Sequence, residues 1–233
     1  AEYMGEFNRE MGDGPDDEGT GRLWFFYITF VAAFTIRVLY VFFHTGKPRK
    51  VKIPNPLSTL IVLGSGGHTA EMMNLLTLLP QDNFSPRNYI AAATDSMSLQ
   101  KARAFEDSLL RHGSGEFMQI YRSREVGQSY ITSICTTLIA TGHAMWLIMR
   151  IRPEVIICNG PGTCIPLCLI AFLLKVAGIK WCYVMYVESI ARVRRLSLSG
   201  KLLYKLRIAD QLFVQWPNLH TMYPRSVYVG RLM

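Results

Sequence analysis

Charged residues are scarce in this chain of 233 residues: only 18% are Asp, Glu, Lys or Arg, and 50% of all residues are hydrophobic. An average soluble domain contains roughly 25% charged residues. Disordered and fibrous proteins lack such an apolar content. The composition therefore excludes those two classes, and it argues against a purely soluble protein.

Cysteine pairs of the kind that bind metal are also missing. The five cysteines are Cys135, Cys158, Cys164, Cys168 and Cys182. None forms a Cys-x-x-Cys pair, and none has a histidine at the spacing of a zinc site. All lie in apolar stretches, where buried reduced thiols are the common outcome. We therefore expect no disulfide framework and no structural metal, and a main body that lies in a reducing compartment.

Acidic residues are scarce after the first 22 positions. Residues 1–22 carry seven acids and two bases, a net charge of −5, whereas the remaining residues carry ten acids and 23 bases, a net charge of +13. The tail is rich in Gly and Asp, so we expect residues 1–22 to be disordered. Ala1 in the place of Met, and the sequence of residues 5–7, are typical of residues added by cloning. An acidic tail therefore precedes a strongly basic body.

One long hydrophobic run separates the tail from the body. Residues 23–43 contain a single charge, Arg37, and a helix of this length spans about 30 Å, the thickness of a bilayer core. Trp24 and Tyr40 lie near its ends, as suits the headgroup interface. Four basic residues follow in the linker 44–57, and by the positive-inside rule they predict a single-pass protein with its C-terminal body in the cytosol. The alternative is an unusually apolar buried helix.

Short β-branched or aliphatic runs alternate with longer helical patterns over residues 58–233. This alternation predicts an α/β domain with a Rossmann-like parallel sheet and with ligand groups at the carboxyl ends of the strands. The predicted strands are residues 59–63, 89–93, 117–121, 155–158, 181–186, 211–214 and 227–229. The predicted helices are residues 70–79, 98–112, 129–150, 165–176 and 198–208.

The fourth predicted strand is preceded by an unusually apolar helix. Residues 131–149 contain no Asp, Glu, Lys or Arg. Their Thr, Ser and Gly content and their position inside the α/β series predict a helix packed on the sheet, one face of which is free to contact lipid. A second membrane span is the alternative.

A glycine-rich loop follows the first predicted strand of the body. It consists of Gly64, Ser65, Gly66, Gly67, His68 and Thr69. Glycines allow the backbone to turn sharply and to approach a ligand, and the start of a helix offers free N–H groups to a phosphate or diphosphate. The loop lacks the lysine of a Walker A motif and the third glycine of a dinucleotide motif. A plain strand-to-helix turn with Thr69 as the N-cap is the alternative.

His68 is the only titratable residue of this loop. The positive end of the helix dipole disfavours an imidazolium at this position, so one interpretation is a neutral histidine that accepts a proton. The other is a histidine that only hydrogen-bonds the loop.

Two further segments follow predicted strands and are expected to lie beside the first loop. The second glycine loop consists of Asn159, Gly160, Pro161, Gly162 and Thr163. Two glycine loops at one sheet edge predict a single crevice. Glu188 follows the strand at 181–186, and we expect its carboxylate to enter the same crevice as a base or to orient a hydroxyl. An ion pair with Arg192 or Arg194 is the alternative.

Residues 192–207 are strongly basic. Such a segment suits anionic lipids or a diphosphate, although a solvated helix face is a common alternative. The sequence contains no nucleic-acid-binding motif, so we expect no nucleic-acid partner.

Several motifs of the body, taken in order, resemble one known family. They are GSGGHT at 64–69, NGPGT at 159–163, ESIARV at 188–193, VQWP at 214–217 and YVGRLM at 228–233. Along almost all of residues 58–233 the chain resembles the membrane-anchor subunits of the endoplasmic reticulum UDP-N-acetylglucosamine (UDP-GlcNAc) transferase. More distantly, it is similar to the acceptor half of the bacterial glycosyltransferase that makes lipid II.

The resemblance implies a fold, a reaction and a set of site residues. The fold is the N-terminal, acceptor-binding half of a GT-B glycosyltransferase. The reaction adds the second GlcNAc to dolichyl-diphosphate-GlcNAc with inversion, with His68 as the first choice of base and Glu188 as the second. The implied acceptor-binding residues are Gly64, Ser65, Gly66, Gly67, Thr69, Asn159, Gly160, Gly162, Thr163, Ser189 and Arg192.

The resemblance also implies partners and a location. The donor, UDP-GlcNAc, binds mainly to a separate soluble catalytic subunit, and this chain alone holds no cofactor. The implied docking residues for that subunit are Gly230, Arg231, Leu232 and Met233. The other expected partners are membrane lipids and further enzymes early in the dolichol pathway, at the cytosolic face of the endoplasmic reticulum.

Two other functions fit the residues. One is a scaffold that recruits a catalytic partner and contributes no catalytic group. The other is a self-sufficient membrane-bound Rossmann enzyme, against which the incomplete glycine motif speaks.

Overall fold

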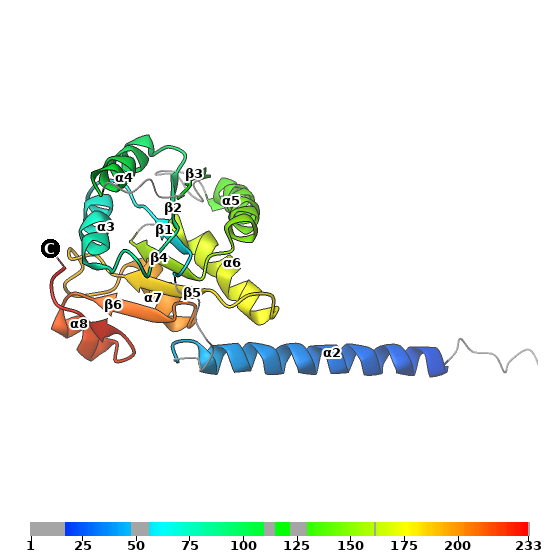
Figure 1. The fold of residues 1–233 in the computed structure, drawn as a ribbon. Coiled ribbons are helices and arrows are strands. Elements are labelled where there is room, and N and C mark those ends of the chain that lie inside the picture. Colours follow the sequence, from blue (N-terminus) through cyan, green and yellow to red (C-terminus); the bar gives the residue numbers. More distant parts are fainter. Residues whose placement is uncertain (1–16, 48–55, 110–114, 122–129, 161, 233) are drawn as a thin grey trace, which may run out of the picture. The chain divides into compact units, whose positions relative to one another are not determined.

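The computed structural model describes residues 17–47, 56–109, 115–121, 130–160 and 162–232, without the side chains of residues 17, 18 and 130–135. The chain divides into two compact units, Ala1–Phe43 and His44–Met233. The predicted tail residues 1–16 and most of the predicted linker 44–57 lie outside the described residues. Figure 1 shows the fold of each unit.

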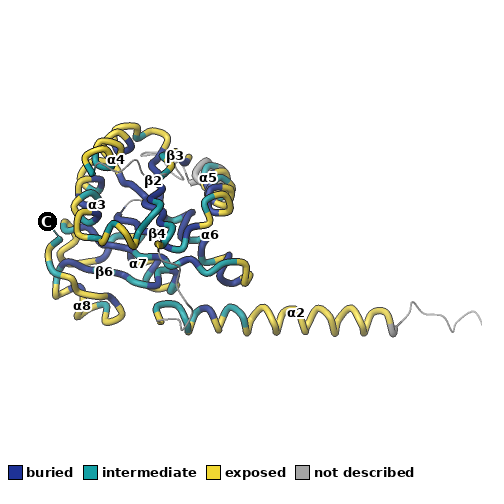
Figure 2. The backbone as a smooth tube through the Cα atoms, in the orientation of Figure 1, coloured by how far each residue is buried: buried dark blue, intermediate teal, exposed yellow. Residues whose placement is uncertain are grey.

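The first unit is dominated by one helix, α2, over Asp17–His44. Its 28 residues correspond to about 42 Å at 1.5 Å per residue. Within it, Gly19–His44 is the one segment of the described residues that is long and apolar enough to cross a membrane, and the helix is exposed along most of its length (Figure 2). The predicted disorder is wrong for residues 17–22, which are helical. Asp17 and Glu18 lie in the first turn, where the helix dipole favours acids.

Seven parallel strands form the sheet of the second unit, in the order β3-β2-β1-β4-β5-β6-β7. They are β1 Thr59–Val62, β2 Arg87–Ala92, β3 Phe117–Ile120, β4 Val155–Asn159, β5 Tyr183–Val187, β6 Gln211–Val214 and β7 Val227–Tyr228. All seven predicted strands are confirmed, with ends that move by up to two residues. The predicted Rossmann-like parallel sheet is confirmed as well.

Helices follow most of the strands. They are α3 Gly67–Leu78, α4 Ser96–Ser108, α5 Tyr130–Ile151, α6 Cys164–Val176, α7 Leu198–Lys205 and α8 Pro217–Met222. The first five were predicted, although α7 stops at Lys205 instead of residue 208 because Arg207 has a positive φ of 51°. The six-residue helix α8 was missed, since it is too short to show a helical period.

Both faces of the sheet are buried. Leu60 and Val62 of β1 pack in one core with residues of α5, α6 and α7, whereas Ile61 and Leu63 pack in a second core with residues of α3 and α4. Alternate side chains of a strand point to opposite faces, so a central parallel strand must be apolar throughout. Figure 1 shows α3 and α4 on one side of the sheet and α5 and α6 on the other.

The apolar helix α5 packs on the sheet with one face only. Ala144 and Leu147 are buried in the core, which confirms the predicted packing for the residues whose side chains are described. Leu138, Ile139 and Trp146 are 54–66% exposed. The helix therefore presents an apolar surface outside the core.

One buried ion pair links a helix to the sheet. Lys175 of α6 donates a hydrogen bond from Nζ to Asp210 Oδ2, and neither side chain is more than 1% exposed. The same carboxylate oxygen accepts a hydrogen bond from the backbone N–H of Val184 at 2.8 Å. Because a charge in this position needs a counter-ion, the pair holds α6 against the amino ends of β5 and β6.

We expect Lys175→Met to lower the free energy of unfolding by about 3–5 kcal/mol, because Asp210 would remain buried without its counter-ion. The double variant Lys175→Met/Asp210→Asn should lower the free energy of unfolding by less, since neither charge then remains in the core. Thermal unfolding of the full chain, followed by circular dichroism, tests the difference. Equal melting temperatures for the single and double variants would contradict it.

Candidate active site

The two glycine loops follow neighbouring strands of the sheet. β1 pairs with β4, and the chain continues from β1 to β2 on one side and from β4 to β5 on the other. A place where two neighbouring strands are followed by connections to opposite sides of the sheet is a topological switch point. Ligands of open parallel sheets bind there, outside the carboxyl ends of the strands. The loop after β1 supplies His68 and the loop after β4 supplies Gly160, with Asn159 at the end of β4 itself. A contact of 3.1 Å between His68 Nδ1 and Asn159 Oδ1 joins the two segments.

The first loop is fixed at its base and open at its tip. The carbonyl oxygen of Gly64 accepts hydrogen bonds from the hydroxyls of Thr69 and Ser98. Gly66, which precedes α3, has a φ of 63°, a conformation that favours glycine, and residues 65–67 are exposed. Thr69 is therefore not the N-cap: it lies inside the first turn of α3 and braces the loop. The exposed start of α3 is suited to an anion.

Gly160 makes room for the imidazole of His68. Its φ is 85°, and a Cβ atom at this position would lie 2.5 Å from both Cε1 and Nδ1 of His68. No side chain larger than hydrogen fits there. Gly160 therefore sets the position of the His68 ring, whereas Gly162 is exposed and has no atom within 4 Å of a Cβ.

A buried carboxylate that the sequence analysis missed lies behind His68. Glu71 of α3 accepts hydrogen bonds from Asn159 Nδ2 and from the hydroxyl of Ser189, each at 2.7 Å. Its Oε2 is 3.7 Å from His68 Nδ1, and its side chain is 7% exposed against 35% for His68. Residues three apart share a face of a helix, so the spacing of His68 and Glu71 was a signal available in the sequence.

These contacts favour one tautomer of the neutral imidazole. A carboxylate only accepts hydrogen bonds, so the amide nitrogen of Asn159 faces Glu71 and the amide oxygen faces His68. An amide oxygen needs a donor, so His68 carries its proton on Nδ1. The lone pair of Nε2 is then free to accept a proton from a ligand.

Glu188 does not enter the switch point as expected. It is 1% exposed, and its Oε2 accepts hydrogen bonds from the backbone N–H and the hydroxyl of Ser197 at 2.9 and 3.0 Å. Burial raises the pKa of Glu188, and the hydrogen bonds from Ser197 oppose that rise. Among the described residues it forms no ion pair with Arg192 or Arg194, so the alternative is not observed either. Its carboxylate instead accepts hydrogen bonds from both ends of the segment 189–197, from Ser189 and from Ser197, and so holds these two ends together.

The remaining predicted residues differ in exposure. Ser189 is buried and donates a hydrogen bond to Glu71. Thr163 is buried as well and directly precedes α6. Arg192 is exposed, together with Arg194 and Arg195, and adds positive charge close in sequence to Ser189. Pro161 and Met233 lie outside the described residues.

The end of the chain is attached to the edge of the sheet. The backbone N–H of Leu232 donates to Gln215 Oε1 at 3.0 Å, and Gln215 Nε2 donates to the carbonyl oxygen of Glu188 at 3.1 Å. The guanidinium of Arg231 lies 4.9 Å from the ring centre of Trp216. Gly230 has a φ of 77°. Leu232 and Gln215 thus connect the C-terminal segment to Glu188, which precedes Ser189.

Three thiols lie together behind the second glycine loop. The sulfur atoms of Cys158, Cys164 and Cys168 are within 4.8 Å of one another, and all three residues are fully buried in an apolar core. Small apolar packing accounts for such a cluster. The prediction of buried free thiols is confirmed for these three and for Cys182, whose pKa burial raises to about 12.

Comparisons with known proteins identify close relatives of the chain. Residues 59–232 match the family model described as "Oligosaccharide biosynthesis protein Alg14 like". The protein named UDP-N-acetylglucosamine transferase subunit ALG14 in Rattus norvegicus is 48% identical over 183 residues, which cover 76% of this chain and 83% of the relative. The protein of the same name in Homo sapiens is 48% identical over 187 residues, with the same coverage of 76% and 83%.

A solved structure has the same fold. The crystal structure of MurG from Acinetobacter baumannii superimposes with a TM-score of 0.54 at 19% sequence identity. The likeness covers 75% of this chain and 45% of that one, so this chain spans under half the length of that structure. It confirms the predicted resemblance to one half of a two-domain fold.

The hydrogen bonds around His68 predict a measurable tautomer. In the neutral state, 15N NMR should show the proton of His68 on Nδ1. Asn159→Leu should raise the fraction with the proton on Nε2, because the hydrogen-bonded amide acceptor is lost and the remaining acceptor, Glu71 Oε2, is 3.7 Å from Nδ1. His220 is an internal control: its Nδ1 lies 2.9 Å from the carbonyl oxygen of Ser226, so it should stay in the Nδ1–H form in both proteins. A His68 proton on Nε2 in the unmodified protein would contradict the assignment.

Proposed function

The chain belongs to the Alg14-like family of oligosaccharide biosynthesis proteins, and on this premise we propose that it is the membrane-anchored, acceptor-binding subunit of a UDP-GlcNAc transferase. The acceptor is a lipid-linked GlcNAc diphosphate, dolichyl-diphosphate-GlcNAc. The observation that carries the proposal is the position of His68: it lies at the switch point between two glycine loops, with Nδ1 held by Asn159 and no hydrogen bond to Nε2 from the described residues.

The first glycine loop supports a role in binding the diphosphate. Residues 65–67 are exposed at the start of α3, where backbone N–H groups and the helix dipole favour an anion. Arg192, Arg194 and Arg195 are exposed on the segment that follows Ser189, and they add the positive charge that a diphosphate or an anionic headgroup requires.

Two features support binding to a membrane. α2 contains a segment long and apolar enough to span a bilayer. In the second unit, the exposed Leu138, Ile139 and Trp146 of α5 form an apolar surface suited to the lipid interface. With the basic linker beside the body, the positive-inside rule favours a cytosolic body at the membrane of the endoplasmic reticulum.

The proposed reaction is an inverting glycosyl transfer. His68 Nε2 takes the proton of the acceptor 4-hydroxyl as its oxygen attacks C1 of GlcNAc, and the C1–O bond to UDP breaks with its electron pair leaving on UDP. The proton ends on His68. Glu71, 3.7 Å from Nδ1, stabilises the resulting imidazolium and holds Asn159 in the orientation that the base requires. Glu188 fixes the conformation of the segment up to Ser197 by accepting its backbone hydrogen bond, and it has a structural role in this scheme.

The donor requires a second protein in this proposal. The relatives are named as subunits of the transferase, and we propose that UDP-GlcNAc binds mainly to a soluble partner subunit. The residues of the C-terminal segment, Gly230 to Leu232 in the described part, are the proposed docking site. A scaffold without a catalytic group is the second candidate, and loss of His68 separates the two.

We expect His68→Ala to reduce transferase turnover by about 10²–10⁴-fold, the usual contribution of a general base, in the complex of full-length chain and partner. Recruitment of the partner to membranes should be unchanged, because the C-terminal segment is untouched. A transferase assay and co-sedimentation on the same membranes measure both. Turnover at the unmodified level with normal recruitment would favour the scaffold.

Gly160→Ala should also reduce turnover, by at least tenfold, because the added Cβ would lie 2.5 Å from the His68 ring at a backbone φ of 85°. Gly142→Ala is the matched control: this exposed glycine of α5 has no atom within 4 Å of a Cβ, and alanine suits a helix. The same assay compares the two variants. Equal turnover in both would show that His68 does not need its observed position.

A further inference from the structure

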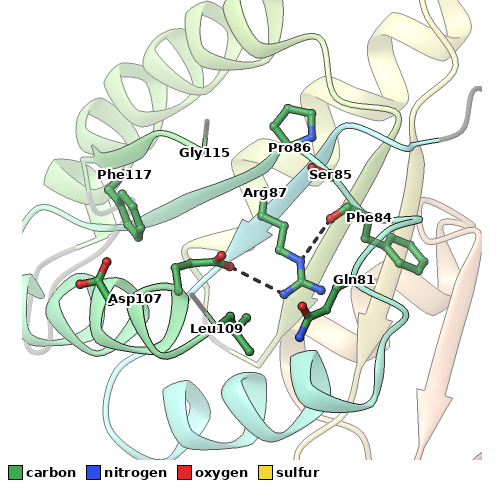
Figure 3. Close-up of a pocket in the computed structure, with 10 residues that line it drawn as sticks. Gln81, Phe84, Ser85, Pro86, Arg87, Asp107, Leu109, Gly115 and Phe117 are labelled. Atoms are coloured by element: carbon green, nitrogen blue, oxygen red, sulfur yellow. Dashed lines mark hydrogen bonds and ion pairs between the residues drawn. The ribbon is translucent and has the colours of Figure 1, made fainter. Parts of the chain in front are cut away.

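Two places in the second unit gather polar or reactive side chains that the proposed reaction does not use. The first is a cavity of about 230 Å³ at the amino ends of β2 and β3 (Figure 3). Its wall contains the guanidinium of Arg87, which faces the carbonyl oxygen of Phe84 and the carboxylate of Glu106, so these polar groups bind one another. The second place is the cluster of three thiols behind the second glycine loop, in which the sulfur atoms have no such counter-group.

The thiol cluster is built from one strand and one helix. Cys158 belongs to β4, and Cys164 and Cys168 lie four residues apart on α6, so that they share one face of that helix. The three sulfur atoms lie within 4.8 Å of one another, and those of Cys158 and Cys168 are 3.7 Å apart. Apolar packing accounts for the burial of the thiols. Their mutual distances add a chemical property, because the three sulfur atoms form one set of ligand atoms.

The distances between the sulfur atoms suit one ion bound to three thiolates. Bonds between a metal and a thiolate are about 2.3 Å long, so three thiolates around one ion lie roughly 3.5–4 Å from one another. Cys158 and Cys168 already have this separation. The other two separations are at most 4.8 Å and exceed the range by about 1 Å or less. Zinc-site spacing in the sequence could not reveal this set, because one ligand comes from a strand and two come from one face of a helix.

The surroundings of the cluster restrict the charge of the ion. All three cysteines are 0% exposed and lie in an apolar core, and no Lys, Arg or His side chain of the described residues donates a hydrogen bond to their sulfur atoms. A buried charge without a counter-ion is costly. Three thiolates around Cu⁺ or Zn²⁺ leave a net negative charge, and Zn²⁺ also prefers a fourth ligand. Three thiolates around a trivalent ion are neutral.

We propose that Cys158, Cys164 and Cys168 form a binding site for a trivalent, thiol-binding metalloid, with arsenous acid, As(OH)₃, as the ligand. Each sulfur forms a bond to arsenic, each As–O bond breaks, and each departing hydroxide leaves as water with the proton of a thiol. Arsenic keeps its oxidation state, so the step needs no oxidant or reductant. Both the acid and the product are neutral, so neither brings a charge into the core. The proposal rests on the thiols alone and does not depend on the proposed transferase function.

The coordination of arsenic in the unmodified protein tests the proposal. The full chain in lipid nanodiscs is reduced with a phosphine, because dithiol reductants compete for arsenic, and is then incubated with sodium arsenite and freed of the excess. Elemental analysis should give one arsenic atom per chain, and X-ray absorption spectroscopy should show three sulfur neighbours and no oxygen neighbour. An equal concentration of Zn²⁺ should leave the arsenic bound. No bound arsenic, an oxygen neighbour, or displacement by Zn²⁺ would overturn the proposal.

Single variants identify the ligands. Cys158→Ala, Cys164→Ala and Cys168→Ala should each weaken arsenite binding by at least about 100-fold, because loss of even an outer-shell partner costs metal sites about 10–100-fold. Cys182→Ala is the matched control: it removes another buried thiol of the same core and should leave the affinity unchanged. Circular dichroism shows which variants fold, and the coordination in the unmodified chain decides the proposal where one does not. Unchanged affinity in a folded variant that lacks one of the three thiols, or an equal loss in Cys182→Ala, would also overturn the proposal.

Discussion

The candidate site depends on one buried carboxylate. Glu71 joins α3 to the ends of two strands, through Asn159 at the end of β4 and Ser189 after β5. A carboxylate buried in this way is stable only when its oxygens are hydrogen-bonded, so the three segments cannot move apart without leaving it unsatisfied. The same bonds turn the amide oxygen of Asn159 toward His68. The requirement to satisfy Glu71 thus fixes the relative position of the segments and favours the imidazole tautomer with its proton on Nδ1.

Burial separates the roles of the two acids near the switch point from that of the histidine. Glu188 is fully hydrogen-bonded to the protein through Ser197 and Ser189, so no oxygen is presented to a ligand. His68 is 35% exposed, and among the described residues its hydrogen bond is made by Nδ1 and none by Nε2. A base must contact the hydroxyl that it deprotonates, and of the three groups the imidazole meets this condition. The carboxylates position the segments on which the ligand would lie.

The sequence predicted the sheet and the loops well because their signals are local. Apolar runs marked every strand, and glycines after two strands marked the switch point together with His68. The role of Glu71 was missed because its partners are 88 and 118 residues away, and no local pattern reveals such pairs. The position of Glu188 was predicted wrongly for a different reason: Ser197 is only nine residues away, but its hydrogen bonds to Glu188 depend on the path of the irregular segment after β5. The contact of His68 Nδ1 with the side-chain oxygen of Asn159, 91 residues away, is another long-range pair that no local pattern reveals.

The open position of His68 has a consequence for the proposed transfer. Residues 65–67 and the His68 side chain are accessible to water, and water competes with the acceptor hydroxyl for the activated sugar. A glycosyl transfer therefore needs a cover over the switch point, and closure of a site also strengthens the electrostatic contacts within it. The chain of contacts from Leu232 through Gln215 to the carbonyl oxygen of Glu188 connects the proposed docking segment to the segment bearing Ser189. Gln215 follows β6 and His68 follows β1, so in the parallel sheet both lie at the carboxyl edge, and a partner bound to the docking segment would lie at the same edge as the proposed base.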